Sequence, residues 1–157
     1  MQKITPFLWF NNQAEEAVNF YTSIFEDSKI ISLARYGEAG PGKPGTLMTA
    51  TFLLAGQEFV ALNGGPEFKF TEAISFYVHC ESQEEVDYFW EKLTTGGEEG
   101  PCGWLKDKFG VSWQIVPNVL AELMSDPDAA KAGRVTQAML QMKKIDIARL
   151  KQAYERG

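Results

Sequence analysis

Two short stretches of this 157-residue sequence resemble each other: EEAVNFY at Glu15–Tyr21 and EEVDYFW at Glu84–Trp90. They align without a gap, and each follows a short apolar stretch typical of a strand, ITPFLWF at Ile4–Phe10 and AISFYVHC at Ala73–Cys80. Internal similarity of this kind is the sequence signature of a repeated structural unit. The sequence therefore predicts two copies of one unit, each starting with a strand and a helix.

The residues around each repeat have the pattern of an amphipathic helix. Asn12 and Glu15 resemble a capping box at the start of a helix over about Gln13–Phe25. Ser82 and Glu85 form the S-x-x-E box of the second helix. Apolar residues recur at helical spacing after both boxes, and a pair of glycines predicts the end of the second helix.

Three further strands are predicted after each helix, which gives each unit the order strand, helix, three strands. The predicted fold class is α+β, all in a single domain. We expect one βαβββ module over residues 1–64, a second over residues 73–118 and a C-terminal helical extension over residues 119–157. The predicted strands after the helices are Lys29–Tyr36, Leu47–Leu54 and Glu58–Asn63 in the first module, and a short strand near Glu98, Cys102–Lys106 and Val111–Val116 in the second.

The extension contains two more predicted amphipathic helices, one starting at Asp126 and one capped by Asp146. Their apolar stripes must be buried on the same chain or on a partner. Because two-fold dimers are the commonest closed assemblies, we predict a homodimer in which the extension covers the partner. A lid on the same chain is the alternative. The stripe residues are Val135, Ala138, Met139 and Met142, then Ile147, Leu150 and Tyr154.

Side chains alternate between two faces along each predicted strand. One face is almost wholly apolar and is predicted to pack under the helices. The other mixes aromatic side chains with small and neutral polar ones, as ligand clefts do. For its aromatic residues, filling a closed core is the alternative. The predicted ligand-binding residues on the mixed face are Phe7, Trp9, Phe59, Asn63, Ser75, Tyr77 and Gln114.

The composition argues against several partners. A formal net charge of −6 and the lack of a basic stripe disfavour nucleic acids and anionic membrane surfaces. The sequence shows no export signal and no apolar run that would span a bilayer, so a cytoplasmic protein is predicted. Cys80 and Cys102 are then expected to stay reduced. His79, the only histidine, is a general base, a lone ligand or simply hydrogen-bonded, and no catalytic residue is assigned.

The sequence resembles the vicinal oxygen chelate superfamily, which includes glyoxalase I, extradiol dioxygenases and bleomycin-resistance proteins. The resemblance rests on the paired units, on NFYTSIF in the first helix and on DKFGVSWQIV near the end of the second unit. More narrowly, PFLWFNNQAEEAVNFY, ALNGGPEF and SDPDAAKAGRVTQAMLQMKKIDIARL resemble PhnB-like proteins described as demethylubiquinone methyltransferase-like. The resemblance implies a glyoxalase/bleomycin-resistance-type curved sheet and a two-fold dimer. One fold hosts many chemistries, so it does not name an activity.

The resemblance implies where a metal would bind, because the metalloenzymes of this superfamily carry their metal ligands on the first, fourth, fifth and eighth strands. These positions correspond to Thr5, Ala61, Ser75 and Gln114. Divalent metals need imidazole, carboxylate or thiolate donors, whereas an alanine methyl offers none and a glutamine amide is neutral. We therefore predict that this site holds no metal.

The methyltransferase description is tested by the strand-to-helix junctions, because adenosyl cofactors are commonly held by a Gly-rich turn there. The junctions are WFNNQAEE at Trp9–Glu16 and HCESQEE at His79–Glu85, and neither contains glycine. The sequence favours a protein that binds a small, partly apolar molecule without metal or cofactor, and it leaves the question of catalysis open. The alternatives are a metal-dependent lyase, isomerase or dioxygenase and a ubiquinone-pathway methyltransferase.

Overall fold

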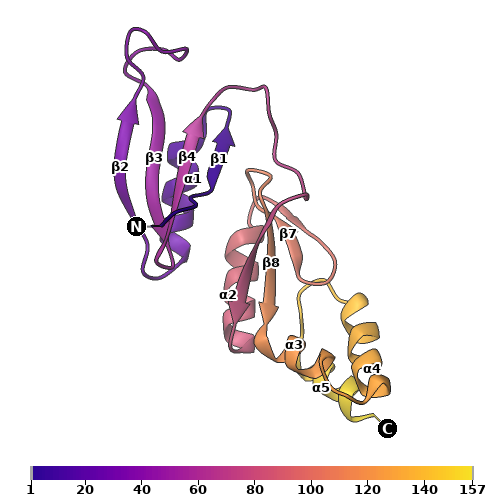
Figure 1. Cartoon of the computed structure of the whole chain (residues 1–157). Helices are drawn as coiled ribbons and strands as arrows, with labels where there is room; N and C mark the ends of the chain where they lie inside the picture. Colours follow the sequence, from indigo (N-terminus) through magenta and orange to yellow (C-terminus); the bar gives the residue numbers. More distant parts are fainter. Residues whose placement is uncertain (1, 157) are drawn as a thin grey trace. The chain divides into compact units, whose positions relative to one another are not determined.

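The first repeat forms a four-stranded sheet with a helix against one face. The computed structural model describes residues 2–156, and the chain divides into two units, Met1–Phe70 and Thr71–Gly157 (Figure 1). The strand order in the first unit is β1-β4-β3-β2, with β1 parallel to β4 and the other pairs antiparallel. Its elements are β1 (Phe7–Phe10), α1 (Ala14–Ile24), β2 (Lys29–Arg35), β3 (Leu47–Leu54) and β4 (Gln57–Asn63).

The second repeat has the same topology. Its strand order is β5-β8-β7-β6, and β5 is parallel to β8 as β1 is to β4. Two βαβββ modules with a C-terminal helical extension are thus confirmed, and the fold is α+β. The elements of the second module are β5 (Ser75–Cys80), α2 (Gln83–Thr94), β6 (Glu98–Glu99), β7 (Trp104–Lys106) and β8 (Ser112–Pro117).

The two helices begin in different ways. In α2 the predicted capping box is present, because the Glu85 N–H donates to Ser82 Oγ at 3.2 Å. In α1 the predicted box is absent: the N-cap residue is Gln13, without a side-chain hydrogen bond. The Ala14 N–H donates instead to Oδ1 of Asn63, 2.9 Å away at the end of β4. Asn63, at the end of β4, therefore caps α1 in place of the predicted Asn12.

The sheet of the first unit corrects the predicted faces. Leu8 pairs with Ala61, and Phe59 pairs with Phe52, so these side chains share one face. Phe59 is only 6% exposed and stacks on Phe52 with ring centroids 5.6 Å apart. Phe59, Ala61 and Asn63 therefore lie on the α1 side, opposite Phe7 and Trp9. Alternation within β4 was predicted correctly, but its register against β1 was wrong by one residue.

The C-terminal helices pack on the second unit of their own chain. They are α3 (Asn118–Met124), α4 (Ala129–Leu140) and α5 (Ile147–Glu155). Gln83 of α2 holds the extension through two hydrogen bonds, one to the Ile145 carbonyl at 3.0 Å and one from the Ile147 N–H at 2.7 Å. The alternative of a lid on the same chain is thus the correct one for these stripes. Their shared core consists of Val116, Leu120, Val135, Met142, Ile145 and Leu150.

One predicted cap in the extension is correct and one is wrong. Asp146 accepts from the Arg149 N–H and caps α5 as predicted. The cap of α4 is Asp128, which accepts from two backbone N–H groups of the first turn. Asp126 is instead bonded to the hydroxyl of Tyr154 at 2.5 Å. No helix within residues 2–156 has the length and apolar character needed to cross a bilayer.

Candidate functional site on the second sheet

Two rows of side chains line the face of the second sheet that lies opposite α2. Strand pairing places Tyr77, Gln114 and Trp104 side by side across β5, β8 and β7. The neighbouring row consists of Ser75, Ser112 and Lys106. Paired residues point to the same side of a sheet, so all six belong to one surface, called here the open face. The structure thus brings the predicted residues Ser75, Tyr77 and Gln114 together.

Gln114 occupies the centre of the open face. Its Nε2 donates a hydrogen bond to Ser75 Oγ at 2.9 Å, which fixes the orientation of the amide. Within residues 2–156 its Oε1 atom accepts no hydrogen bond, and the side chain is half-buried. Gln114 therefore presents an oriented acceptor to the space above the sheet.

Aromatic rings border this acceptor on both sides. Tyr77 is 45% exposed, and its ring centroid lies 4.7 Å from that of His79. Partial burial raises the pKa of the Tyr77 hydroxyl, so it stays a neutral donor at physiological pH. Trp104 is half-buried on the other side of Gln114. A flat, partly apolar molecule fits such a pair of rings.

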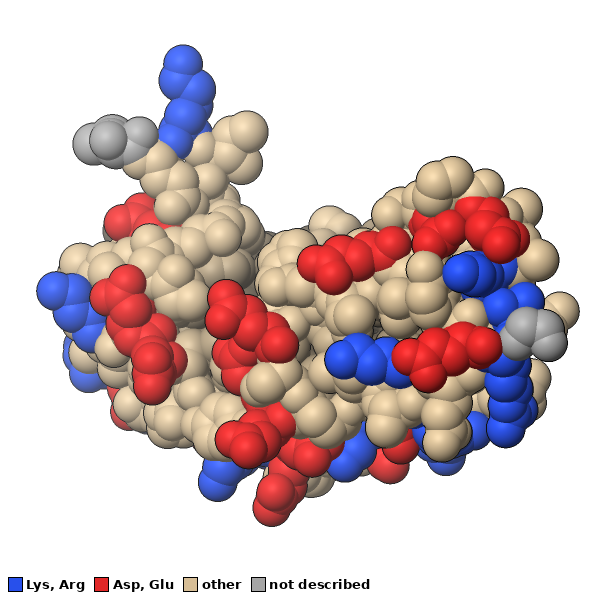
Figure 2. All heavy atoms as spheres, turned by 90° about the horizontal axis from the view of Figure 1, so that it is seen from below, with Lys and Arg blue, Asp and Glu red and all other residues tan. Residues whose placement is uncertain are grey.

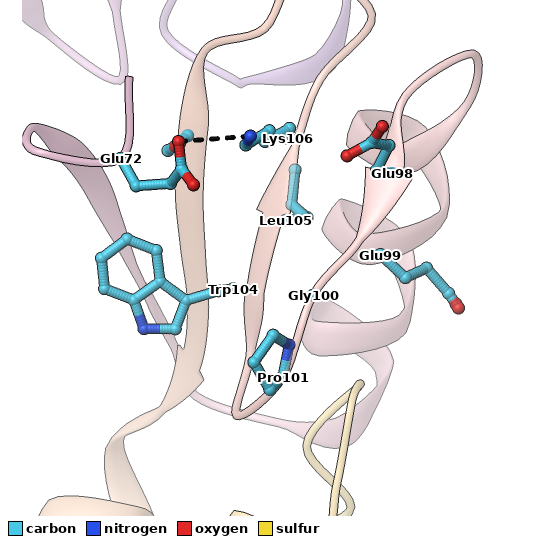
Figure 3. A pocket seen from close by; sticks show the side chains of 9 residues that line it. Glu72, Glu98, Glu99, Gly100, Pro101, Trp104, Leu105 and Lys106 are labelled. Carbon is cyan, nitrogen blue, oxygen red and sulfur yellow. Dashed lines mark ion pairs between the residues drawn. The ribbon is translucent and has the colours of Figure 1, made fainter.

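A cavity of about 400 Å³ adjoins Trp104 and the Ser112–Lys106 row (Figure 3). Lys106 forms an ion pair with Glu72, with 3.2 Å between Nζ and Oε1. Glu72 lies in the segment before β5. The hydrogen bond from Lys106 is the main reason that the pKa of the Glu72 carboxyl lies below its usual value. Both side chains are substantially exposed. Solvent-exposed ion pairs contribute little to stability, so this one opens easily.

Ser112 is the unusual residue of this cavity. Its side chain is 1% exposed, and its Oγ is buried without a hydrogen-bond partner among the described residues. Lys106 lies directly across from it on β7. Leaving a buried hydroxyl unsatisfied costs about 1–3 kcal/mol, and native structures rarely do so without reason. Ser112 therefore holds an unused hydrogen-bonding group next to the cavity.

The remaining predicted residues belong to the first unit. Phe7 is 63% exposed, whereas Trp9 is half-buried and donates its indole N–H to the Gly65 carbonyl at 2.9 Å. A side chain at Gly64 would collide with this indole, since its Cβ would lie 2.5 Å from the ring. Phe59 and Asn63 lie on the helix side of the same sheet and do not join Phe7 and Trp9. Trp9 is thus held rigidly by its own unit.

Sequence reasoning missed Glu72, Trp104, Lys106 and Ser112 as site residues. Alternation along the predicted strand Val111–Val116 places Ser112 on the same face as Gln114, but the pattern assigns it no role. Alternation along the predicted strand over residues 102–106 puts Trp104 and Lys106 on one face. Whether Gln114 lies on the same face depends on the β7–β8 register, which the sequence does not show. Glu72 precedes its strand and carries no periodic signal.

The positions that correspond to metal ligands do not fit a metal. Ala61 is completely buried and lies on the α1 side of its sheet, opposite the predicted face. Ser75 and Gln114 are bonded to each other, and Thr5 precedes β1. The described chain also contains no cluster of three or more His, Cys, Asp and Glu residues suited to a metal. The donors present are neutral oxygens and an amide, which hold divalent transition metals poorly.

Comparison with known proteins identifies the family. Residues 2–116 match the model of the family described as 3-demethylubiquinone-9 3-methyltransferase. The chain belongs to this family. It is thereby a PhnB-like member of the vicinal oxygen chelate superfamily, as the sequence resemblance predicted. Residues 117–157, which include the last residue of β8 and the helices α3, α4 and α5, lie outside the matched range.

Solved structures agree with this assignment. A Bacillus cereus PhnB protein, described as a putative 3-demethylubiquinone-9 3-methyltransferase, is 48% identical, with a TM-score of 0.66, and the match covers 74% of this chain and 99% of that one. A Pseudomonas aeruginosa protein is 20% identical, with a TM-score of 0.62 and coverages of 74% and 98%. The fosfomycin resistance protein FosX of Listeria monocytogenes is 18% identical, with a TM-score of 0.54 and coverages of 78% and 97%. The last two show the fold alone. No curated protein matches the chain.

Proposed function

We propose that this protein binds a small, partly apolar molecule on the open face of the second sheet, without a metal. The observation that carries the proposal is the buried, unpaired hydroxyl of Ser112 beside a cavity of about 400 Å³. Small-molecule sites typically measure about 300–1,000 Å³ and combine apolar walls with a few oriented polar groups. Trp104 and Ser112 line the cavity, and Tyr77 and Gln114 extend the site beside Trp104 along the open face.

Binding is favoured over catalysis by the hydrogen bonds of the open face. A nucleophilic serine needs a base within hydrogen-bonding distance. Ser75 Oγ accepts from the Gln114 amide, and within residues 2–156 Ser112 Oγ has no partner. Neither serine hydroxyl is therefore activated in this state.

The methyltransferase in the family description remains an alternative. Against it, the segments between β1 and α1 and between β5 and α2 contain no glycine that would let the backbone approach an adenosyl cofactor. Titration of the protein with S-adenosylmethionine by calorimetry tests this directly. Saturable binding would favour the methyltransferase over the binding function proposed above.

We further propose that the protein acts in the cytoplasm as a homodimer. Support comes from large apolar side chains that stay exposed on the first unit, among them Phe7, Leu33 and Phe68, with exposed fractions of 63%, 47% and 64%. Exposed apolar surface of this kind is typical of an interface. Both cysteines are free thiols, which suits a reducing compartment. Light scattering at micromolar concentration tests the dimer, and a monomer contradicts it.

The binding function is tested by native mass spectrometry of the purified protein together with an NMR fragment screen. The Trp104 indole N–H reports on the proposed site, and the indole N–H of Trp90 in α2 is the internal control. We expect ligands to shift the Trp104 signal and not that of Trp90. The Tyr77→Ala variant should weaken binding, whereas Tyr88→Ala, a similarly exposed tyrosine on α2, should not. No retained molecule and no fragment that shifts Trp104 would contradict the proposal.

A further inference from the structure

We infer that the cavity beside Trp104 and Ser112 selects a small organic cation, an ammonium group carried on an apolar body. This inference rests on the proposed binding function and narrows its ligand to one chemical class. It is argued from the charges, the aromatic wall and the unpaired hydroxyl of the cavity.

The side chains that line the cavity carry an excess of negative charge. The lining residues include three carboxylates, Glu72, Glu98 and Glu99, and a single ammonium, Lys106, but the Glu99 side chain points away, so the groups directed at the cavity have a formal sum of 1 − 2 = −1. Lys106 is already paired with Glu72. Within residues 2–156, Glu98 and Glu99 form no ion pair. Figure 2 shows Asp and Glu side chains interspersed with Lys and Arg on one molecular face. A concave site of one sign concentrates ligands of the opposite sign.

Lys106 lies between two carboxylates of the open face. On one side it forms the ion pair with Glu72, and on the other it lies opposite Glu98 in the register of β6 and β7. Figure 3 shows Glu98 pointing toward Lys106, whereas Glu99 points away from it. An incoming ammonium can thus take the place of Lys106 at Glu72 while Lys106 moves to Glu98. After the exchange, both Glu72 and Glu98 have a cationic partner.

The other groups of the cavity suit the same ligand. The indole of Trp104 and the ring of Pro101 border the space below the ion pair (Figure 3). An indole face attracts a cation and also packs against an apolar body. The Ser112 Oγ, which is buried and has no partner within residues 2–156, can accept an N–H from the ligand when Lys106, directly across from it on β7, moves to Glu98. An anionic ligand, in contrast, would have only Lys106 to bind and would face Glu72 and Glu98.

Three probes of similar size separate charge from shape: 2-phenylethylamine as the cation, 2-phenylethanol as the neutral form and 3-phenylpropanoate as the anion. Each is titrated into the full-length protein while the Trp104 indole signal is followed by NMR. We expect the amine to bind about three- to tenfold more tightly than the alcohol, and the anion to bind most weakly.

Two variants test the origin of the preference. Glu98→Gln should lower the affinity for the amine by about threefold and leave the alcohol unchanged, because it removes one charge from an exposed position. Glu91→Gln on α2 is the matched control, since Glu91 is exposed but does not line the cavity. Ser112→Ala should weaken the binding of 2-phenylethylamine in the same assay.

The outcomes distinguish the two proposals. Equal affinities for the three probes, tighter binding of the anion, or equal effects of Glu98→Gln and Glu91→Gln would overturn cation selection and leave the binding function intact. If none of the probes shifts Trp104 while other fragments do, cation selection alone is refuted. If no fragment of any kind shifts Trp104, the binding function fails with it.

Discussion

Asn63 offers the sharpest test of the structure, because the sequence predicted a ligand-binding residue and the structure shows a helix cap. Its Oδ1 accepts from the Ala14 N–H at 2.9 Å, and its Nδ2 donates to the Leu47 carbonyl at 3.3 Å. Asn63→Ala removes both bonds. Loss of an N-cap costs about 1 kcal/mol, and an unpaired, partly buried carbonyl adds about 1 kcal/mol or more. We expect the free energy of unfolding to fall by about 2–3 kcal/mol.

Two further variants separate the cap from other effects. Asn63→Asp keeps the acceptor, and a carboxylate is favoured at a helix N-terminus, so this variant should recover about 1 kcal/mol of the loss. Asn12→Ala is the matched control at the residue that the sequence predicted as the cap. Because the start of α1 shows no side-chain cap of its own, this change should cost less than about 0.5 kcal/mol.

The assay is urea denaturation, with the slope m compared among variants to check that the same surface unfolds. Amide hydrogen exchange at Ala14 gives a local measurement, and exchange should accelerate in Asn63→Ala. The reasoning is refuted if Asn12→Ala destabilises as much as Asn63→Ala. It is also refuted if Asn63→Ala leaves stability unchanged and abolishes ligand binding, as a ligand contact would.

Phe59→Ala should lower the free energy of unfolding by about 3–5 kcal/mol in the same assay, because the ring is 6% exposed and stacked on Phe52. Phe7→Ala, at a ring that is 63% exposed, should lower it by less than about 1 kcal/mol. Similar losses for the two variants would contradict the assigned faces. Burial raises the pKa of the Cys80 thiol to about 12, so at pH 8 only about one molecule in ten thousand carries the reactive thiolate. Cys80 should therefore resist labelling by a thiol reagent in the folded protein and react after unfolding in urea, as followed by mass spectrometry, and rapid labelling in the native state would show that the site is open. Adding zinc, nickel, manganese or iron should leave the melting temperature of the protein unchanged, because the donors at Ser75 and Gln114 are neutral and hydrogen-bonded to each other. One tightly held metal per chain that is lost in Gln114→Ala would contradict this prediction.

The sequence by itself determined what depends on local patterns. The repeat of Glu15–Tyr21 at Glu84–Trp90 predicted two modules, and the structure shows both with one topology. Ser82 and Asp146 were recognised as caps because each bonds within three residues of itself. Alternation along β5 and β8 placed Ser75, Tyr77 and Gln114 on one face, since the side-chain period of a strand is two.

Only the tertiary structure decided matters that depend on partners distant in the sequence. Alternation assigns sides within a strand but not between strands, so the β1–β4 pairing moved Phe59 and Asn63 to the helix side. The cap of α1 lies 49 residues away at Asn63, and Asp126 is used by Tyr154 from α5. The unpaired hydroxyl of Ser112 is likewise a property of its surroundings. A hydrogen bond or a buried contact is made with whichever group the fold brings near, and a local pattern contains no information about that group.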